Sequence, residues 1–465
     1  MPTTIVWLRH DLRLRDNPAL QAAAARGAVV PLWIDEGDTG DPWRPGAASR
    51  VWLHDGLAAF DALLVARGSR LVIARGAPLD VLRGMLTACA ADAVFWNRRH
   101  TPAGIAGDST LKAALAEHCE VRSFAGNLLF EPGAVMTGGG TPYKVFTPFY
   151  RACLAAGPPP APPPEPAALA PPARWPSSLQ LDDLALEPHI DWTAGIRARW
   201  QAGERTAQAR LATFIDDTVI DYPERRDQPA AGAISGLSPY FCQGALGVRD
   251  AWAQLSAASA ASGNTPYESA AAAWLRQLVW REFAWHLLFH FPHTTDAPLR
   301  DEFADMVWVD DAEGLAAWQR GRTGFPLVDA GMRELWETGF MHNRVRMVTA
   351  SLLTKHLGQH WLAGARWFWD TLVDGDLANN SLGWQWVAGC GADAAPYFRI
   401  FNPYAQSRKF DPDGVYLRRW LPELAALDAA QIHQPPPGIA GYPAPIVDLA
   451  PAREAALARY AEIRR

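Results

Sequence analysis

Residues 4–34, TIVWLRHDLRLRDNPALQAAAARGAVVPLWI, decide how the N-terminal part of the chain folds. Two apolar runs, Thr4–Leu8 and Val29–Ile34, lie on either side of the alanine-rich run Ala19–Arg26. The sequence Asp16-Asn17-Pro18 is typical of a helix start, because Asn or Asp caps a helix and Pro fits its first turn. A strand, a helix and a second strand in this order predict a βαβ unit with parallel strands.

The same alternation continues to about residue 125. Further strands are expected at Leu71–Ala74, Ala93–Trp96 and Val121–Phe124, and further helices at Ala48–Arg67, Leu79–Ala91 and Ser109–His118. No GxGxxG sequence follows the first strand, so no dinucleotide site of that kind is expected there. The N-terminal part is therefore predicted as an α/β domain with a parallel sheet.

The rest of the chain has a different pattern. Residues 157–176, which begin GPPPAPPP, cannot form a helix or a central strand and are predicted as an interdomain linker. Long helical patterns follow, such as Glu268–His290, where Trp274, Gln277 and Arg281 fall on one face. The expected organisation is an α/β domain at 1–130, a proline-rich linker at 131–195 and a helical domain at 196–465.

Composition excludes several classes of protein. No charge-free apolar run reaches about 18 residues, and the N-terminus has no signal-peptide features, so no membrane span and no export are expected. Five scattered cysteines without a CxxC predict a reduced, cytoplasmic protein with no disulfide framework and no metal site. A net charge of −6 argues against a broad nucleic-acid coat. The basic stretch Arg399–Arg419 is either a local nucleic-acid contact or ordinary solvated surface.

The cluster at residues 374–386 is the best candidate for a ligand site. The chain has 21 tryptophans against 10 tyrosines, which points to an aromatic-rich cavity or to a redox role. Two acids, two asparagines and two tryptophans lie within the 13 residues from Asp374 to Trp386. Asp374-Gly375-Asp376 lacks the spacing of a calcium loop. Its carboxylates could accept ribose hydroxyls or a flavin N–H, and the alternative is a capped helix start.

Seven segments in this order resemble the photolyase/cryptochrome family, and they are Trp7–Leu20, Ile234–Tyr240, Trp280–Phe283, Met341–Arg344, Asp374–Asp376, Gly383–Trp386 and Ala395–Pro403. The pattern is most similar to that of cyclobutane pyrimidine dimer photolyases. The resemblance implies a Rossmann-like α/β domain at the N-terminus and an all-α, FAD-binding domain at the C-terminus.

The resemblance also implies the residues that bind FAD. Arg281 and the loop at 234–238 are expected at the phosphates and ribose, and Asn380 is expected at flavin N5. Ile234 stands where the family has threonine, which removes a hydrogen bond of about 1 kcal/mol. The expected FAD residues are Tyr222, Ile234, Ser235, Gly236, Leu237, Ser238, Trp274, Gln277, Arg281, Asn343, Asp374, Gly375, Asp376 and Asn380.

Two further groups of residues follow from the resemblance. Trp384, Trp361 and Trp308 match an electron-transfer chain from the flavin to the surface, and the alternative is that they are core tryptophans. The residues expected to bind the lesion are Arg226, Trp280, Asn343, Arg344, Met347, Trp386 and Arg399. The branch that repairs (6-4) photoproducts carries histidines at the positions of Asn343 and Met347.

The implied function is a monomeric deoxyribodipyrimidine photolyase that uses blue light and reduced FAD to split cyclobutane dimers in UV-damaged DNA. The alternatives are a cryptochrome-like photoreceptor, a (6-4) photolyase and, outside the family, a generic α/β nucleotide-binding protein. About 40 residues follow Leu424, which favours repair over signalling. Gln277 replaces the Glu of dimer-repairing relatives and cannot transfer a proton. Ala103 and Gly104 replace an Asn-Glu pair that contacts folate in relatives, so folate is not expected and the antenna chromophore is left open.

Overall fold

A parallel sheet forms the N-terminal part of the protein, whose computed structural model describes residues 1–38, 40–394 and 398–463. Its elements are β1 (Thr3–Leu8), α1 (Pro18–Arg26), β2 (Ala28–Asp35), α2 (Ala47–Val65), β3 (Val72–Arg75), α3 (Pro78–Cys89), β4 (Ala93–Asn97), α4 (Pro102–Leu115) and β5 (Glu120–Phe124). The five strands lie in the order β3-β2-β1-β4-β5, and all neighbouring pairs are parallel. The predicted α/β class is confirmed.

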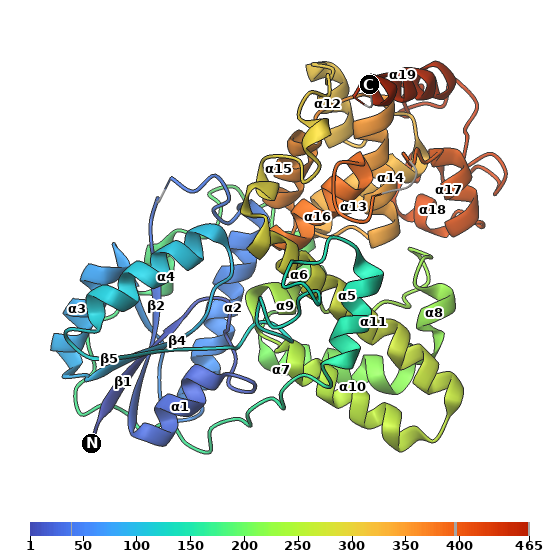
Figure 1. Ribbon diagram of the computed structural model, residues 1–465. Coiled ribbons are helices and arrows are strands. Elements are labelled where there is room, and N and C mark those ends of the chain that lie inside the picture. Colours follow the sequence, from blue (N-terminus) through green and yellow to red (C-terminus); the bar gives the residue numbers. More distant parts are fainter. Residues whose placement is uncertain (39, 395–397, 464–465) are drawn as a thin grey trace.

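Different helices cover the two faces of this sheet (Figure 1). Helices α1 and α2 pack with Val6 and Val29 in one core, and α3 and α4 pack with Ile5 and Val30 in another. Successive residues of a strand point to opposite faces, so the central strand β1 is buried along its whole length. Burial on both faces explains why the strands read as continuous apolar runs.

The sequence predicted the strands better than the helices. All five strands agree with the expected ranges to within one residue at each end. The helix expected at Ser109–His118 was wrong, because α4 begins at Pro102. Thr101 caps this helix by accepting from Gly104 N at 3.2 Å, and proline occupies the first turn. Gly104 and Gly107 weaken the helical pattern there and hid the true start.

The proline-rich segment at 157–176 contains no helix. It is fastened to the α/β part by two backbone hydrogen bonds. Val29 N donates to Ala170 O at 2.9 Å, and Asp16 N donates to Pro163 O at 3.0 Å. The segment therefore runs along the α/β part after a first helix of the helical part (Phe146–Ala155) and before the remaining helices.

The rest of the described chain is helical, with short single-turn segments between the helices. Its α-helices are α5 (Phe146–Ala155), α6 (Ala194–Arg199), α7 (Glu204–Thr213), α8 (Tyr222–Arg225), α9 (Ser238–Gln243), α10 (Val248–Ser262), α11 (Thr265–His290), α12 (Ala312–Gln319), α13 (Pro326–Thr338), α14 (Asn343–Ser351), α15 (Trp361–Thr371), α16 (Leu377–Ala388), α17 (Pro403–Phe410), α18 (Val415–Trp420) and α19 (Leu449–Glu462). In the described ranges we find no helix with the length and apolar character needed to span a bilayer.

Helix α11 lies between the two cores of the helical part. It has 26 residues and begins after Asn264, whose side chain accepts from Tyr267 N at 3.4 Å. Trp274 and Phe283 enter one core, and Ala284 and Leu288 enter the other. A long helix buried on several sides is rigid, so side chains on its remaining face keep fixed positions.

The loop that follows β1 joins the α/β part to the helical part. Arg13 Nη1 donates to Gly244 O at 2.9 Å, and buried Asp16 pairs with buried Arg249 at 2.6 Å. Gly244 has φ +78°, and an added Cβ would lie 1.9 Å from His10 O. Only glycine permits this close approach between the two parts.

Replacing Gly244 with alanine should therefore destabilise the protein strongly. Gly263→Ala is the matched control, because Gly263 also has positive φ (+57°) but nothing lies within 4 Å of an added Cβ. We expect Gly263→Ala to cost about 1–2 kcal/mol, the left-handed penalty alone. Gly244→Ala should cost more than about 4 kcal/mol. Urea unfolding followed by circular dichroism measures both, and equal costs would contradict the close docking of the loop.

Candidate functional site

A cavity of ≈ 700 Å³ opens in the helical part. It lies between α11, α14, α16 and the loop that leads into α9. Of the residues expected at the site, Trp308 and Trp361 do not line the cavity. The expected residues that do line it are Tyr222, Arg226, Ile234, Ser235, Gly236, Leu237, Ser238, Trp274, Gln277, Trp280, Arg281, Asn343, Arg344, Met347, Asp374, Gly375, Asp376, Asn380, Trp384, Trp386 and Arg399.

One face of α11 forms a wall of the cavity. Trp274, Gln277 and Arg281 occur at helical spacing on this face, as the sequence predicted. Trp280 also reaches the cavity, and its ring stacks on Phe146 of α5 with centroids 3.6 Å apart and planes 7° from parallel. The Gln277 amide donates to Ala273 O of the preceding turn at 3.3 Å. The wall therefore offers a fixed aromatic surface beside a neutral amide.

Asp376 links this wall to the start of α16. Its carboxylate caps α16 by accepting from Asn379 N at 2.9 Å and from Asn379 Nδ2 at 2.8 Å. The other oxygen accepts from Trp285 Nε1 of α11 at 3.2 Å and lies 4.0 Å from Arg281 Nη2. Arg281 also donates to Asn127 O at 3.1 Å. The predicted helix cap and the predicted ligand site therefore occupy the same residue.

Asp374 is engaged by two partners that come from different segments. Arg346 Nη2 donates to both carboxylate oxygens at 2.9 Å, and Ser238 Oγ donates to one of them at 2.7 Å. The sequence analysis did not assign Arg346. It lies three residues after Asn343 on α14, and this spacing puts both on one helix face. That spacing was a usable signal for Arg346.

Some backbone and amide groups that line the cavity have unused hydrogen-bonding atoms that could bind a ligand. Ser235, Gly236 and Leu237 donate no backbone hydrogen bond to any part of the chain that the structure describes. Gly236 has φ +63°, and a Cβ there would lie 2.8 Å from Arg210 Nη1. Asn380 Nδ2 donates to Ala365 O at 2.9 Å. Its Oδ1 receives no hydrogen bond from the described residues and is available to accept one.

Burial keeps two further cavity groups neutral. It lowers the pKa of His342 to about 4, and the ring caps α14 through Nδ1, which accepts from Arg344 N at 3.2 Å. Burial raises the pKa of the Cys242 thiol well above its usual value, and this thiol donates to Gly375 O at 3.0 Å. Behind the α11 wall, burial raises the pKa of Glu282 to about 7, with Arg281 opposing the shift.

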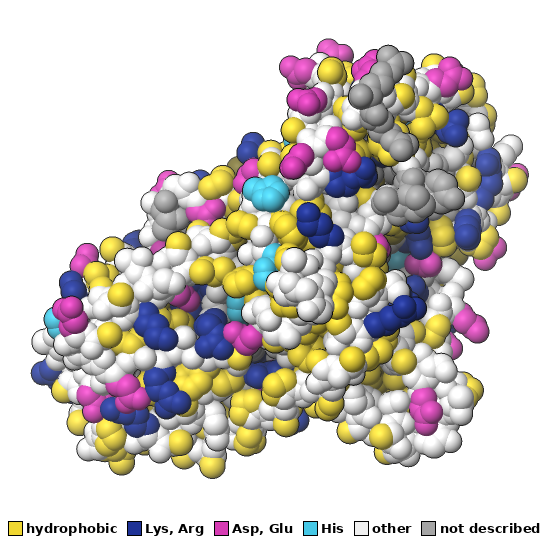
Figure 2. Space-filling view, in the orientation of Figure 1, with side chains coloured by type: hydrophobic (Ala, Val, Ile, Leu, Met, Phe, Trp, Pro, Cys, Tyr) yellow, Lys and Arg dark blue, Asp and Glu magenta, His cyan; other side chains and the backbone are white. Residues whose placement is uncertain are grey.

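One part of the cavity, which we call its mouth, is aromatic and charged. Its residues are all partly exposed or exposed, and they are Arg226, Asp227, Trp280, Asn343, Arg344, Met347, Trp386 and Arg399. Arg399 lies over the Trp386 ring at 5.2 Å, and Arg344 pairs with Asp227 at 2.8 Å. Five arginines and four aspartates line the whole cavity, so it carries slightly more positive than negative charge in a chain of net charge −6. On the face drawn in Figure 2, lysines and arginines form small separate groups. Of the segment Ala395–Pro403, residues 395–397 lie outside the described residues.

The three tryptophans assigned to electron transfer lie at different depths. Trp384 lines the cavity and packs edge-on against Phe368, with centroids 4.9 Å apart. Trp361 is 1% exposed, and His360 contacts both its ring (5.7 Å) and that of half-buried Trp308 (4.9 Å). Trp318, which the sequence analysis did not assign, is buried against Trp384 at 6.0 Å.

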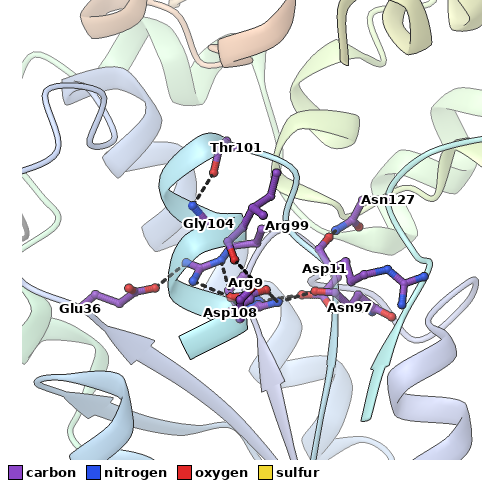
Figure 3. A network of polar contacts seen from close by, with 12 residues as sticks. Arg9, Asp11, Glu36, Asn97, Arg99, Thr101, Gly104, Asp108 and Asn127 are labelled. Carbon is purple, nitrogen blue, oxygen red and sulfur yellow. Dashed lines mark hydrogen bonds and ion pairs between the residues drawn. The ribbon is translucent and has the colours of Figure 1, made fainter. Parts of the chain in front are cut away.

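A second polar cluster lies at the carboxyl edge of the sheet, where parallel α/β folds often bind ligands. Here the side chains pair with one another (Figure 3). Asp108 accepts from Arg9 at 3.1 Å and from Arg99 at 2.8 Å, and Arg99 pairs with Glu36 at 2.7 Å. Burial lowers the pKa of Arg9 to about 10. The described residues contain no group of three or more His, Cys, Asp or Glu arranged to hold a metal.

Comparison with known proteins agrees with this geometry. Residues 4–167 match the family described as DNA photolyase, and residues 274–462 match the FAD binding domain of DNA photolyase. A deoxyribodipyrimidine photo-lyase of Agrobacterium fabrum is 44% identical over 99% of this chain and 98% of its own length. Cryptochrome-2 of Arabidopsis thaliana is 36% identical over 97% of this chain and 77% of its length.

A solved structure is also similar along the whole chain. The crystal structure of a bacterial class III photolyase from Agrobacterium tumefaciens superposes with a TM-score of 0.95 and 44% identity, and the match covers 100% of this chain and 98% of that one. The expected fold, with an α/β domain followed by an all-α FAD-binding domain, is confirmed.

Proposed function

The chain belongs to the DNA photolyase family, and we propose that it is a deoxyribodipyrimidine photolyase that splits cyclobutane pyrimidine dimers in UV-damaged DNA with blue light. One observation carries this proposal. A single ≈ 700 Å³ cavity combines an inner part rich in hydrogen-bonding groups with a mouth that has two tryptophan walls and three arginines. Such a cavity suits a cofactor inside and a flipped pyrimidine dimer at the entrance.

The inner part fits FAD. The backbone N–H groups of Ser235, Gly236 and Leu237 and the side chain of Arg281 suit the phosphates. The available oxygen of Asn380 suits a flavin N–H. The remaining FAD contacts are proposed as in the sequence analysis, with Asp374 acting through Arg346 and Ser238. When bound, reduced FAD supplies the light-driven electron that splits the dimer.

The mouth fits a dimer that has left the DNA stack. Trp280 and Trp386 offer flat apolar surfaces, and Met347 adds a flexible one. Asn343 can donate to a pyrimidine carbonyl. Arg226, Arg344 and Arg399 suit the neighbouring phosphates. The stacking of Trp280 on Phe146 at 3.6 Å holds the first surface in place before the lesion arrives.

A cryptochrome-like photoreceptor is the second candidate, because the match to Arabidopsis cryptochrome-2 spans 97% of this chain and because Gln277 departs from dimer-repairing relatives. A (6-4) photolyase is disfavoured, since Asn343 and Met347 stand where that branch has histidines. We further propose a monomer in a reducing, cytoplasmic environment, a proposal supported by five free cysteines. At the position of the folate-binding Asn-Glu pair, Ala103 and Gly104 offer no side-chain partner, so we expect no folate there.

The cofactor assignment predicts a colourless variant. Asp374→Asn and Asp376→Ser together remove both carboxylates, while Ser still caps α16. Losing the Asp376 contact and the carboxylate that positions Arg346 and Ser238, at about 1.5–3 kcal/mol each, should weaken FAD binding at least about 100-fold. Asp310→Asn with Glu313→Gln removes two exposed charges outside the cavity and should bind FAD normally. The ratio of flavin to protein absorbance is the measurement, and normal flavin in a folded double variant would contradict the assignment.

The tryptophan assignment predicts an order of effects on flavin reduction under blue light with an external reductant. Trp384→Phe should slow reduction more than Trp361→Phe or Trp308→Phe, because of these three only Trp384 lines the cavity. Trp318→Phe is the control, since Trp318 touches Trp384 but is outside the proposed series. Flavin absorbance over time gives the rates. A wild-type rate of flavin reduction in Trp384→Phe, or the largest decrease of that rate in Trp318→Phe, would mean that electrons reach the flavin by another route.

The repair function is tested on oligonucleotides with one thymine dimer or one (6-4) lesion. Chemically reduced wild-type protein should repair the thymine dimer under blue light. Gln277→Glu should raise the yield per photon, because a protonated carboxyl can both donate a hydrogen bond and transfer a proton. Gln277→Leu should lower it by removing the donor. Repair of only the (6-4) lesion, or of neither lesion, would replace the proposed substrate or favour the photoreceptor.

A further inference from the structure

Asp227 is an acidic residue at a mouth that is otherwise suited to phosphates. It lies two residues after α8 and lines the cavity. Its side chain is 38% exposed, and its Oδ2 accepts from Arg344 Nη2 at 2.8 Å. The family resemblance assigned Arg344 and gave no role to Asp227. The question is what a carboxylate does beside an arginine that DNA would use.

The guanidinium of Arg344 is held from two directions. Asp227 takes its edge, and the Phe410 ring lies 4.4 Å from its centre. Lys409 lies over the same ring at 5.2 Å. Arg344 is the second residue of α14, where the helix dipole disfavours a positive charge. The nearby carboxylate offsets this cost, so the ion pair is favourable in the free protein.

The other two mouth arginines are not paired in this way. Arg226 lies 5.6 Å from the Tyr222 ring and Arg399 lies 5.2 Å from the Trp386 ring. Neither forms an ion pair with a carboxylate in the ranges that the structure covers. Arg344 is therefore the mouth arginine whose charge is already compensated before any DNA binds.

We propose that Asp227 competes with a DNA phosphate for Arg344 and so weakens DNA binding. This inference rests on the proposed function. A carboxylate and a phosphate oxygen use the same edge of a guanidinium, so a phosphate must displace Asp227 to bind there. When repaired DNA dissociates, Arg344 pairs with Asp227 again. This regained ion pair favours release of the product.

The proposal predicts a gain of affinity when the negative charge of Asp227 is removed. Asp227→Asn in the FAD-loaded protein should bind both undamaged and dimer-containing duplexes more tightly, by up to about fivefold, the equilibrium value of an exposed ion pair. The slope of log affinity against log salt should steepen by up to about 0.9, the value for one additional phosphate contact. Fluorescence anisotropy with labelled duplexes at several salt concentrations measures both quantities.

Two further variants separate the pair from general charge effects. Glu224→Gln removes an exposed acid three residues away that has no ion-pair partner among the described residues, and it should change affinity clearly less than Asp227→Asn. In an Arg344→Gln background, Asp227→Asn should have no more effect than Glu224→Gln, because the group that it releases is absent. Unchanged flavin absorbance in every variant checks that the cavity is intact.

Each other outcome overturns the inference. Equal changes of DNA affinity in Asp227→Asn and Glu224→Gln would mean that Asp227 acts only through its contribution to the overall negative charge. A loss of affinity in Asp227→Asn would mean that Asp227 holds Arg344 ready for DNA rather than screening it. A gain that persists with Arg344→Gln would remove Arg344 from the explanation. These results leave repair by the wild-type protein standing, whereas a wild-type protein that binds no DNA would overturn the proposed function as well.

Discussion

The cavity depends on the hydrogen bonds that the carboxylate of Asp376 accepts. Asp376 ends the loop after α15, caps α16 and receives the indole N–H of Trp285 from α11. Helices α11 and α16, which carry the tryptophan walls, are thereby both held by this one carboxylate. Loss of the cap would let the first turn of α16 unwind, and Trp384 and Trp386 would then no longer be held in fixed positions. The same carboxylate lies near Arg281, so the group that holds α11 and α16 together is also part of the polar lining of the cavity.

Charge in the cavity is tolerable because Asp374 and Asp376 each lie beside a guanidinium. Asp374 binds Arg346 through both oxygens at 2.9 Å, and Asp376 lies 4.0 Å from Arg281. Burying one charge alone would cost several kcal/mol, while a paired and hydrogen-bonded group is far cheaper. A buried ion pair adds less stability than an apolar core of similar volume, so these pairs are not explained by stability alone.

The sequence predicted the sheet closely because burial on both faces leaves a continuous apolar signal in each strand. Most of the cavity lining followed from the resemblance to the photolyase/cryptochrome family, whose motifs lie at helix starts and on one face of α11. The sequence analysis missed Arg346 as the partner of Asp374, since this ion pair joins residues 28 positions apart on different elements. Trp318 and Asp227 were missed for the same reason. Contacts between elements follow from packing, so spacing along α14 could place Arg346 on the same face as Asn343 but could not identify Asp374 as its partner.

Net charge and local charge lead to different expectations for DNA binding. A coat of lysines would bind any duplex through released counterions and would leave the protein on undamaged DNA. This chain has a net charge of −6, and the arginines that suit phosphates are gathered around one cavity. Under the proposed function, weak general attraction leaves most of the DNA-binding energy to contacts at that mouth. Undamaged DNA cannot place a base between the two tryptophans without breaking a good stack, whereas a dimer is already poorly stacked. Selectivity in this design comes from how little the rest of the surface contributes.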